Sequence, residues 1–457
     1  MRAIAGRIWG YRYVILAVVW LLYIINYFDR IAVLTFLPYI QQDLALTPVQ
    51  VGQLASVFFF AYALAQVSAG YLADRIGPKK VMGIAIVVFT TVTALTGLVK
   101  TFWQFIVLRI GLGLGEGHHF APGVKAINQW FPPEEKGRAT AFFATSWAVA
   151  PAIVPVLLTT IAATFFDGAW RPVFFLLAVP GLFGMVILWR YVADSPREML
   201  EKGRVSEDEF RTITADTAAA GRRDGGPDEA PEKERKNYGA FLKDPFFYLY
   251  TVALFCQLMV YWGTTTWLTT FLVSQHGMDL KTMGLFASAP YVVAFFAMLL
   301  GGFLMDKVFG RMKPIALIAY VGCIPVLYLL GQVATGNTGL LLGLLLLSGF
   351  FINLNFGSIY AYVQKRYPKD VVGSAAGLSN GIGQLGSFVA PLGAGYLVVV
   401  AADGSQNFAG VFVFFAAAAA VAALCSLLLR EKPLAGAQVP GSPTRAGTAV
   451  QRRDAES

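Results

Sequence analysis

Two pairs of ionisable residues lie inside stretches that are otherwise apolar enough to cross a membrane. Asp29 and Arg30 are adjacent in the first of these stretches, and Arg109 and Glu116 are seven residues apart in the fourth. A charged side chain at the centre of a bilayer costs about 2.5–3.5 kcal/mol on insertion scales unless it faces a partner or a water-filled cavity. These four residues are therefore the first candidates for a functional site.

The chemistry open to these residues is anion binding and proton exchange. Arg30 stays charged in any surroundings, and its fork of N–H donors matches a carboxylate in a two-point contact. Asp29 and Glu116 can gain or lose a proton when their surroundings change. Residues seven apart lie close to one face of a helix, so Arg109 and Glu116 are expected to point into the same cavity. The alternative is a structural charge network that holds the first and fourth helices together.

Composition identifies the class of protein. Apolar residues make up 56% of the chain and charged residues 14%, whereas a soluble domain carries about 25% charged residues. A soluble fold would have to bury nearly every apolar stretch, and no globular domain of this length does so. The sequence therefore predicts an all-α integral membrane protein.

Twelve stretches approach the roughly 20 residues that a helix needs to cross a bilayer. They fall into two sets of six, which predicts two six-helix bundles with pseudo-symmetry, residues 1–195 and residues 246–432. The predicted spans are 13–37, 50–73, 81–99, 103–128, 139–164, 172–193, 246–272, 281–306, 313–331, 337–364, 372–399 and 407–430.

Two segments outside the bundles are rich in Pro, Gly and charge. Residues 196–245 are expected to form a cytoplasmic linker, and residues 433–457 a disordered cytoplasmic tail. Ser206 and Glu209 have the spacing of a capping box, which predicts a short surface helix over 206–219 at the start of the linker.

Orientation follows from the loops, because Lys and Arg accumulate on the cytoplasmic side of membrane proteins. Basic residues are concentrated near both termini and in the loops after the second, fourth, eighth and tenth predicted helices. We therefore expect both termini to be cytoplasmic. The net charge of +9 is then explained without a nucleic-acid partner. No cleavable signal-peptide pattern precedes the first helix, which we expect to be retained.

The sequence contains no motif of an enzyme, a metal site or a nucleotide site. Cys256, Cys323 and Cys425 lie far apart in predicted helices without metal-ligand spacing, and we expect them to pack in the core. The glycines of residues 111–117 lie in the middle of a predicted helix, with no preceding strand and no Lys-Ser/Thr ending, which excludes a phosphate-binding loop. We expect no enzymatic activity, no metal and no cofactor.

A loop pattern repeats in the two halves. Residues 70–80 read Gly-Tyr-Leu-Ala-Asp-Arg-Ile-Gly-Pro-Lys-Lys, and residues 302–313 read Gly-Phe-Leu-Met-Asp-Lys-Val-Phe-Gly-Arg-Met-Lys. With twelve predicted spans, this repeat resembles the major facilitator superfamily, whose signature loop follows the second helix and has a weaker copy after the eighth. The resemblance implies a gating role for Asp74, Arg75 and Asp306, with Asp74 capping a neighbouring helix in a latch that stabilises the outward-open state. The alternative is that these charges only end a helix and fix the topology.

A narrower resemblance is to the anion:cation symporter family, which includes sugar-acid and hexuronate transporters, sialin and the vesicular glutamate transporters. It rests on Asn26-Tyr27-Phe28-Asp29-Arg30, on Arg109 with Glu116, on Trp130-Phe131-Pro132 with Lys136-Gly137-Arg138-Ala139, and on Asp194-Ser195-Pro196-Arg197-Glu198. The resemblance implies that Asp29 and Glu116 are the protonation sites. It implies that Arg30 binds the substrate carboxylate and that Arg109 is a charge partner of the acids.

One feature departs from the pattern of that family. His118 and His119 follow Glu116-Gly117, where relatives more often have small residues or proline. Because histidine titrates near physiological pH, each is a candidate for packing, for substrate contact or for proton handling. The three roles stay open, and with them the proton stoichiometry.

The second half supplies polar and aromatic groups in place of charges. We expect part of this set to line a central site between the halves, where transporter ligands bind; hydrogen bonding between helices is the alternative for each residue. Together with Arg30, the predicted substrate contacts are Tyr27, Tyr62, Gln257, Tyr261, Asn355 and Asn380.

These observations predict a secondary transporter that imports a small organic anion, a sugar acid or another monocarboxylate, with protons by alternating access. We expect a multi-pass monomer in a plasma membrane, the inner membrane of a bacterium. One alternative is a transporter-like sensor of an organic acid, and another is an anion exchanger or facilitator without proton coupling. Sodium in place of protons also stays open.

Overall fold

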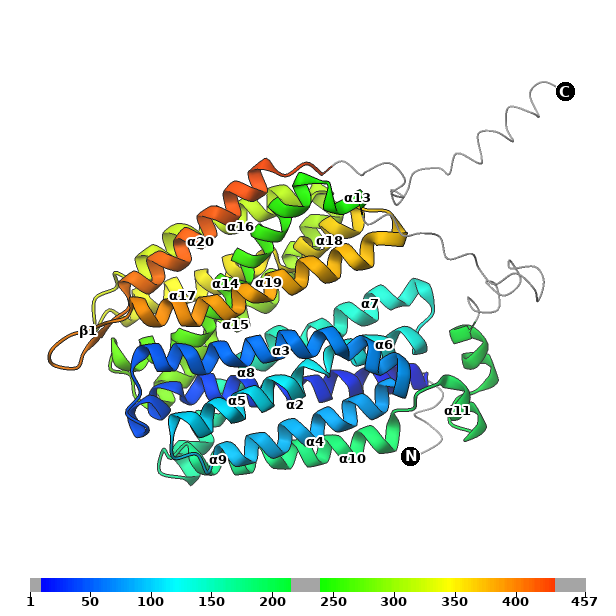
Figure 1. Cartoon of the computed structure of the whole chain (residues 1–457), viewed down its shortest axis with the longest axis horizontal. Coiled ribbons are helices and arrows are strands. Elements are labelled where there is room, and N and C mark those ends of the chain that lie inside the picture. The colour runs from blue at the N-terminus through cyan, green and yellow to red at the C-terminus, as the bar shows by residue number, and fades with distance from the viewer. Residues whose placement is uncertain (1–9, 215–238, 432–457) are drawn as a thin grey trace, which may run out of the picture.

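The computed structural model describes residues 10–214 and 239–431. The predicted tail, residues 433–457, and the middle of the predicted linker lie outside the described residues. The described residues form two helical bundles that lie one above the other in Figure 1. The N-terminal bundle consists of α2 (Tyr11–Asp43), α3 (Pro48–Ile76), α4 (Pro78–Thr96), α5 (Phe102–Gly117), α6 (Phe120–Trp130), α7 (Pro133–Ala144), α8 (Ser146–Phe165), α9 (Arg171–Leu176) and α10 (Ala178–Tyr191), followed by α11 (Pro196–Glu201).

The C-terminal bundle repeats this pattern of long helices. Its elements are α13 (Gly239–Leu242), α14 (Pro245–Ser274), α15 (Leu280–Phe303), the π-helical turn η1 (Leu304–Phe309), α16 (Met312–Leu330), α17 (Thr338–Leu354), α18 (Phe356–Arg366), α19 (Lys369–Leu397) and α20 (Ala409–Leu428). A short hairpin of β1 (Val399–Val400) and β2 (Gln406–Asn407), paired antiparallel, joins the last two helices.

In the described part of the chain, ten helices are long and apolar enough to cross a membrane, judged by length and composition. The other two predicted spans, the fourth and the eleventh, are also helical but more polar. The fourth is divided at His118–His119 into α5 and α6, and it carries Arg109, Glu116 and Lys125. The eleventh is α19, a continuous helix of 29 residues that is rich in Gly and Ser. The all-α membrane fold predicted from the sequence is confirmed.

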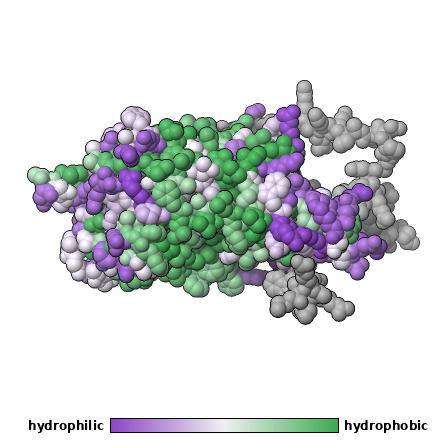
Figure 2. Space-filling view, turned by 90° about the horizontal axis from the view of Figure 1, so that it is seen from below, coloured by the Kyte–Doolittle hydropathy of each residue, from purple (hydrophilic) through white to green (hydrophobic). Residues whose placement is uncertain are grey.

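On the face shown in Figure 2, apolar side chains form a belt across the middle of the molecule, and polar side chains gather at its two ends. Large apolar residues such as Val67, Trp103 and Val186 are exposed on the surface of the molecule. In water such a surface would be unfavourable, whereas in a bilayer it contacts lipid.

Local sequence signals begin several of the long helices. Thr47 and Gln50 form a capping box at the start of α3, and Pro48 is the first residue of this helix. Asp279 accepts hydrogen bonds from the backbone N–H groups of Lys281 and Thr282 at the start of α15. These caps satisfy N–H groups that a helix leaves without internal partners.

The two bundles touch at one end of the molecule and separate at the other (Figure 1). At the touching end, Ser56 Oγ in α3 donates a hydrogen bond of 2.6 Å to the carbonyl oxygen of Phe388 in α19. A Cβ atom added to Gly52 would lie 2.5 Å from the Pro391 carbonyl oxygen, so only glycine permits this approach of the two backbones. We call this the closed end. The other end, where α2 begins and α20 ends, is called the open end.

The repeated loops of the two bundles lead into helices that are capped in the same way. Lys79 N donates to Asp194 Oδ1 over 2.9 Å at the start of α4. Met312 N and Lys313 N donate to Glu431 Oε1 over 2.6 Å and 3.0 Å at the start of α16. Each acid follows the last long helix of its own bundle, so the internal repeat includes a long-range cap that the loop sequences did not reveal.

The beginning of the linker is attached to the first helix. A helix occupies 207–214, and the rest of the helix predicted over 206–219 lies outside the described residues. Ser206 Oγ accepts a bond of 3.2 Å from Glu209 N, which is half of the predicted capping box. The Glu209 side chain instead accepts a bond of 3.0 Å from Arg12 N at the start of α2.

Candidate functional site

A central cavity of about 550 Å³ lies between the two bundles, a volume typical of a site for a small molecule. Among the described residues that line it, Arg30 alone is charged. The polar lining consists of Tyr23, Tyr27, Arg30, Tyr62, Gln66, Thr140, Tyr261, Asn353, Tyr360, Gln364, Asn380 and Gln384. The remaining wall consists of Phe59, Phe120, Val124, Trp147, Leu258, Trp262, Met298, Phe356, Ala376 and Gly377.

Arg30 is held by an acid on one side and by aromatic rings on the other. Its Nε and Nη2 atoms lie 2.9 Å and 2.7 Å from Glu116 Oε2. Its guanidinium carbon lies 4.5 Å from the centre of the Tyr62 ring, 4.6 Å from that of Tyr27 and 5.4 Å from that of Trp262. Cation–π attraction and the ion pair together fix the orientation of the Arg30 guanidinium on the cavity wall.

Helical spacing explains why α2 carries Arg30 to the cavity. Tyr23, Tyr27 and Arg30 follow one another at intervals of four and three, so they share one helix face, and all three line the cavity. Asp29 lies next to Arg30 in sequence but leaves the helix on another side, where it is 2% exposed and adjacent to Thr93 of α4. Asp29 does not line the cavity.

Arg109 and Glu116 do not share the cavity, contrary to the expectation from their spacing. Both are buried behind its wall, with exposures of 1% and 0%. Arg109 Nε donates a bond of 3.2 Å to the Leu54 carbonyl oxygen, and its guanidinium stacks on the Phe58 ring at 4.5 Å. Arg109 therefore links α5 to α3, while Glu116 pairs with Arg30 of α2. The ion pair of Arg30 and Glu116 therefore joins the first and fourth predicted helices in this conformation, as the alternative of a structural charge network expects.

The structure separates the two adjacent histidines at the break between α5 and α6. His118 is bonded through Nε2 to Ser68 Oγ at 2.8 Å and through Nδ1 to the Leu114 carbonyl oxygen at 2.7 Å. His119 is 1% exposed and packs its ring 5.8 Å from that of Tyr23. Neither histidine lines the cavity, so direct substrate contact has no support in this conformation.

Four of the six further predicted substrate contacts line the cavity, namely Tyr27, Tyr62, Tyr261 and Asn380. The other two do not, because their amides are hydrogen-bonded inside the C-terminal bundle. Gln257 Nε2 donates to the Ile352 carbonyl oxygen over 2.7 Å. Asn355 Nδ2 donates to the Tyr320 hydroxyl over 3.0 Å. For Gln257 and Asn355, bonding between helices replaces the predicted ligand contact.

The predicted gating residues lie at the open end, and their contacts stay within each bundle. Asp74 Oδ1 pairs with Lys125 Nζ at 2.7 Å, and Arg75 Nη1 donates to the Tyr71 hydroxyl over 3.3 Å. Asp306 is exposed in η1. The latch was predicted for a different conformation of the transporter, so the gating role stays a prediction.

Several lining residues were missed by the sequence analysis although their spacing points to them. Gln66 follows Tyr62 by four positions, and Gln364 follows Tyr360 by four positions. Residues four apart lie one above the other on a helix. A polar residue four positions after a predicted cavity residue is therefore itself a candidate for the cavity wall.

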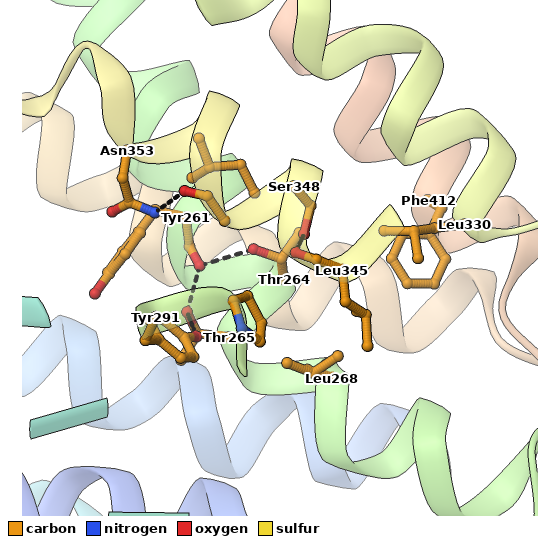
Figure 3. A pocket seen from close by; sticks show the side chains of 13 residues that line it. Tyr261, Thr264, Thr265, Leu268, Tyr291, Leu330, Leu345, Ser348, Asn353 and Phe412 are labelled. Carbon is orange, nitrogen blue, oxygen red and sulfur yellow. Dashed lines mark hydrogen bonds between the residues drawn. The ribbon is translucent and has the colours of Figure 1, made fainter. Parts of the chain in front are cut away.

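A smaller cavity of about 30 Å³ adjoins the central one and shares Tyr261 and Asn353 with it. Figure 3 shows the polar groups beside it, where the Tyr291 hydroxyl donates to Thr265 Oγ1 over 2.7 Å and Thr265 Oγ1 donates to the Tyr261 carbonyl oxygen over 2.6 Å. Its volume is about that of one water molecule in the liquid. It is too small for an organic substrate.

Nothing in the described part of the chain brings three His, Cys, Asp or Glu residues together as a metal site.

A family model of the Major Facilitator Superfamily matches residues 19–391, which is more than half of the chain. The chain belongs to the Major Facilitator Superfamily. Members of this superfamily are transporters, and the predicted superfamily is confirmed.

Two related members of the superfamily are named as probable transporters of organic acids. The chain is 29% identical over 431 residues to a probable sulfoacetate transporter of Cupriavidus necator, covering 92% of this chain and 94% of the relative. It is 30% identical to a probable L-galactonate transporter of Escherichia coli, covering 90% and 87%. A bacterial homologue of the human lysosomal transporter Spinster, in an inward-facing and occupied conformation, has the same fold with a TM-score of 0.73 at 17% identity, covering 94% and 99%. The predicted resemblance to sugar-acid transporters is confirmed.

Proposed function

We propose that this transporter imports a small monocarboxylate, of the sugar-acid class, together with protons by alternating access. The observation that carries the proposal is that Arg30 is the single charged residue among the described residues of the cavity wall. Arg30 offers one guanidinium to one carboxylate, and tyrosine hydroxyls and side-chain amides such as those of Asn380 and Gln384 surround it. This wall suits an acid with hydroxyl groups, and the relatives named for sulfoacetate and L-galactonate support an organic acid.

The buried ion pair supplies a physical link between substrate and proton. When Glu116 is ionised, it holds Arg30 through two short contacts. When Glu116 is protonated, it no longer neutralises Arg30, and the guanidinium is left to attract the substrate carboxylate. Proton binding and anion binding then favour each other, which is the requirement for symport. Asp29 is the second proposed protonation site.

The contacts at the two ends support alternating access. At the closed end, Ser56 bonds across the bundles, as does Thr269, whose Oγ1 donates to the Leu34 carbonyl oxygen over 2.6 Å. The basic loops of both bundles lie at the open end, together with the beginning of α2 and the end of α20. By the bias of basic residues to the cytoplasm, this end is cytoplasmic and the conformation faces inward. We also propose a monomer in the inner membrane of a bacterium.

The test is uptake into liposomes that contain the purified protein. A panel of labelled acids, including L-galactonate, sulfoacetate, a hexuronate and an aromatic carboxylate, is offered under an inward proton gradient. We expect concentrative uptake of a monovalent sugar acid that is abolished by a protonophore. Exchange without accumulation would identify an exchanger, a requirement for sodium would replace protons as the coupling ion, and a lack of any movement would favour the sensor alternative.

A further inference from the structure

Two cations from other parts of the chain bind the last turn of α10. Lys79 Nζ, at the start of α4, donates a hydrogen bond of 3.2 Å to the Trp189 carbonyl oxygen. Arg204 Nη1, which follows α11, donates a bond of 2.7 Å to the carbonyl oxygen of Arg190. Because these two carbonyl groups are consecutive in the helix, the two side chains converge on one turn. We call Lys79 and Arg204 the α10 cation pair.

The C-terminal bundle repeats this arrangement at the end of α20. Lys313 Nζ donates over 3.4 Å to the Leu429 carbonyl oxygen. Arg366 Nη1 donates over 2.9 Å to the carbonyl oxygen of the next residue, Arg430. The last carbonyl groups of a helix lack partners inside the helix, and Lys or Arg side chains can satisfy them. Helix capping therefore explains why a Lys and an Arg occur here in both bundles.

The two pairs of cations differ in their charge balance. Arg366 is 5% exposed, and Asp244 neutralises it through bonds of 2.6 Å and 3.0 Å. Arg204 is exposed, and neither Arg204 nor Lys79 forms an ion pair with a described acid. Capping does not account for this difference.

The acids of the neighbouring segment are engaged with other groups. Asp194 Oδ1 accepts a bond of 2.9 Å from the backbone N–H of Lys79. Glu198 Oε1 pairs with Lys202 Nζ at 2.6 Å. An ammonium has three N–H donors and a guanidinium has five, so Lys79 Nζ and Arg204 keep donors beyond those that bind α10. The α10 cation pair can therefore donate to an anion in charge-assisted hydrogen bonds.

An exposed apolar strip begins beside the α10 cation pair. The Trp189 ring is 55% exposed, and its centre lies 5.0 Å from Lys79 Nζ. Leu182, Val186 and Trp189 follow one another at intervals of four and three, so they share one face of α10. Leu182 and Val186 are each 65% exposed, and α10 lies at the outer edge of the N-terminal bundle in Figure 1. Tryptophan is typical of the level at which lipid headgroups meet the acyl chains, which places the strip along the acyl chains and the cations among the headgroups.

We propose that the α10 cation pair and this apolar strip form a binding site for one anionic phospholipid. The lipid phosphate accepts hydrogen bonds from Lys79 Nζ and Arg204, and an acyl chain lies along Trp189, Val186 and Leu182. A soluble phosphate would use the cations and leave the strip uncovered. The inference goes beyond the proposed transport function and shares with it only the assignment of the open end to the cytoplasm, where the leaflet carries anionic lipids.

Native mass spectrometry of the purified full-length protein tests this site. The probe is an equimolar mixture of phosphatidylglycerol and phosphatidylcholine with the same acyl chains. Each of the two cations contributes about fivefold, so we expect the first bound lipid to be phosphatidylglycerol with a preference of about twentyfold. Lys79→Gln combined with Arg204→Gln keeps N–H donors for the α10 carbonyl groups and removes both charges, which should abolish the preference. Lys313→Gln, at the corresponding place in the other bundle, is the matched control and should keep it.

Three results of this experiment overturn the proposal. The first is a preference that survives in the double variant, and the second is a preference that Lys313→Gln reduces equally, which would indicate a general effect of surface charge. The third is binding of glycerol 3-phosphate as tight as that of phosphatidylglycerol, which would identify a site for a soluble phosphate. Because no substrate is added, a failure of the proposed transport function leaves each of these results valid.

A second measurement leaves both cations in place, in case the double variant does not fold. The protein is reconstituted into equimolar vesicles of the same two lipids, one of which carries brominated acyl chains that quench tryptophan fluorescence on contact. The difference between the unmodified protein and Trp189→Phe gives the signal of Trp189. We expect brominated phosphatidylglycerol to quench this signal more strongly than brominated phosphatidylcholine does. Equal quenching by the two lipids overturns the proposal.

Discussion

Arg30 binds Glu116 through a single oxygen atom. The Nε and Nη2 atoms of Arg30 lie 2.9 Å and 2.7 Å from Glu116 Oε2, and Glu116 Oε1 has no hydrogen-bond partner in the described part of the chain. The strongest arginine–carboxylate contacts use two oxygens and two parallel N–H groups. The geometry here leaves the Arg30 guanidinium incompletely paired at the cavity wall. This is the arrangement expected of a group that exchanges one carboxylate for another.

Replacing Arg30 by Lys tests whether this guanidinium binds substrate. Arg30→Lys keeps the positive charge and loses the two-point contact with a carboxylate. We expect substrate affinity to fall by about 1.5–3 kcal/mol, the scale of a hydrogen bond to a charged group. Calorimetric titration of the purified variant with the acid identified by uptake gives this value.

The matched control is Arg171→Lys, which changes another arginine that is stacked on an aromatic ring and paired with an acid. Arg171 Nη2 lies 2.6 Å from Asp43 Oδ2, and its guanidinium lies 4.5 Å from the centre of the Trp170 ring. It does not line the cavity, so affinity should stay the same. Equal affinities of Arg30→Lys and the unmodified protein would remove Arg30 from the binding site.

Neutralising the acids tests coupling. We expect Asp29→Asn or Glu116→Gln to abolish uptake against a gradient, because an amide cannot carry the proton. Exchange of substrate should survive in at least one variant, since exchange need not release the proton. Counterflow and proton-driven uptake are measured on the same liposomes. Concentrative uptake by either variant under a pH difference alone would show that its acid is not an obligatory coupling site.

The fold was predictable because span length and hydropathy are properties of a local window. Each predicted bilayer span coincides with one helix or with two consecutive helices. The partner of Glu116 was not predictable in the same way. Arg109 shares a helix with Glu116, and spacing favoured this pair, but the rotation of α2 against α5 brings Arg30 to the carboxylate instead. Such rotations depend on the packing of all neighbouring helices, which no local window contains.

The same limit applies to the caps and to the polar groups of the second half. Asp194 and Glu431 cap helices that begin more than 100 positions earlier in the chain, so no spacing rule identifies them. Gln257 and Asn355 are as polar as Asn380, yet only Asn380 lines the cavity. The sequence shows that a polar side chain inside a predicted span needs a hydrogen-bond partner. Only the structure shows whether that partner is a ligand in the cavity or a group on another helix.

Acid should weaken one contact at the open end. Asp244 accepts bonds from Arg366 Nε at 2.6 Å, Arg366 Nη2 at 3.0 Å and the Tyr367 hydroxyl at 2.8 Å. Burial alone would raise the pKa of Asp244, but the bonds from Arg366 and Tyr367 outweigh burial and hold its pKa below the usual range. A lowered pKa contributes stability that is complete above the unfolded pKa of about 3.9 and is lost as pH falls through the folded pKa.

We therefore expect Asp244→Asn to lower the free energy of unfolding by about 1.5–3 kcal/mol at pH 7, as for hydrogen bonds to charged groups. The difference from the unmodified protein should shrink as pH falls below about 4. Thermal unfolding in detergent at a series of pH values measures it. Asp208→Asn, in the exposed helix 207–214, is the control and should change stability little. A difference that is equal at pH 7 and pH 3 contradicts the assignment.

Adding a methyl group at the closed end should disturb the contact between the bundles. The Cβ atom of Gly52→Ala would lie 2.5 Å from the Pro391 carbonyl oxygen, whereas that of Gly70→Ala, in the same helix α3, meets no atom within 4 Å. Overpacking costs about 1–3 kcal/mol. We expect Gly52→Ala to lengthen the distance between spin labels at positions 100 and 402 and to slow uptake, and Gly70→Ala to do neither. Equal label distances in both variants would show that this glycine contact does not hold the closed end.

Membrane potential distinguishes the stoichiometries of coupling. With Asp29 and Glu116 both titrating, a monovalent acid would enter with two protons and carry one net positive charge inward, whereas one proton would make the step neutral. The potential acts only on net charge, with about 2.3 kcal/mol per charge per 100 mV. We expect two protons, so that an inside-negative potassium diffusion potential drives uptake at zero pH gradient. Valinomycin with equal potassium on both sides is the control, and the single-acid variants should lose the response. Uptake that ignores the potential would reject the two-proton mechanism for a monovalent substrate and leave Glu116, the partner of Arg30, as the sole coupling acid to test.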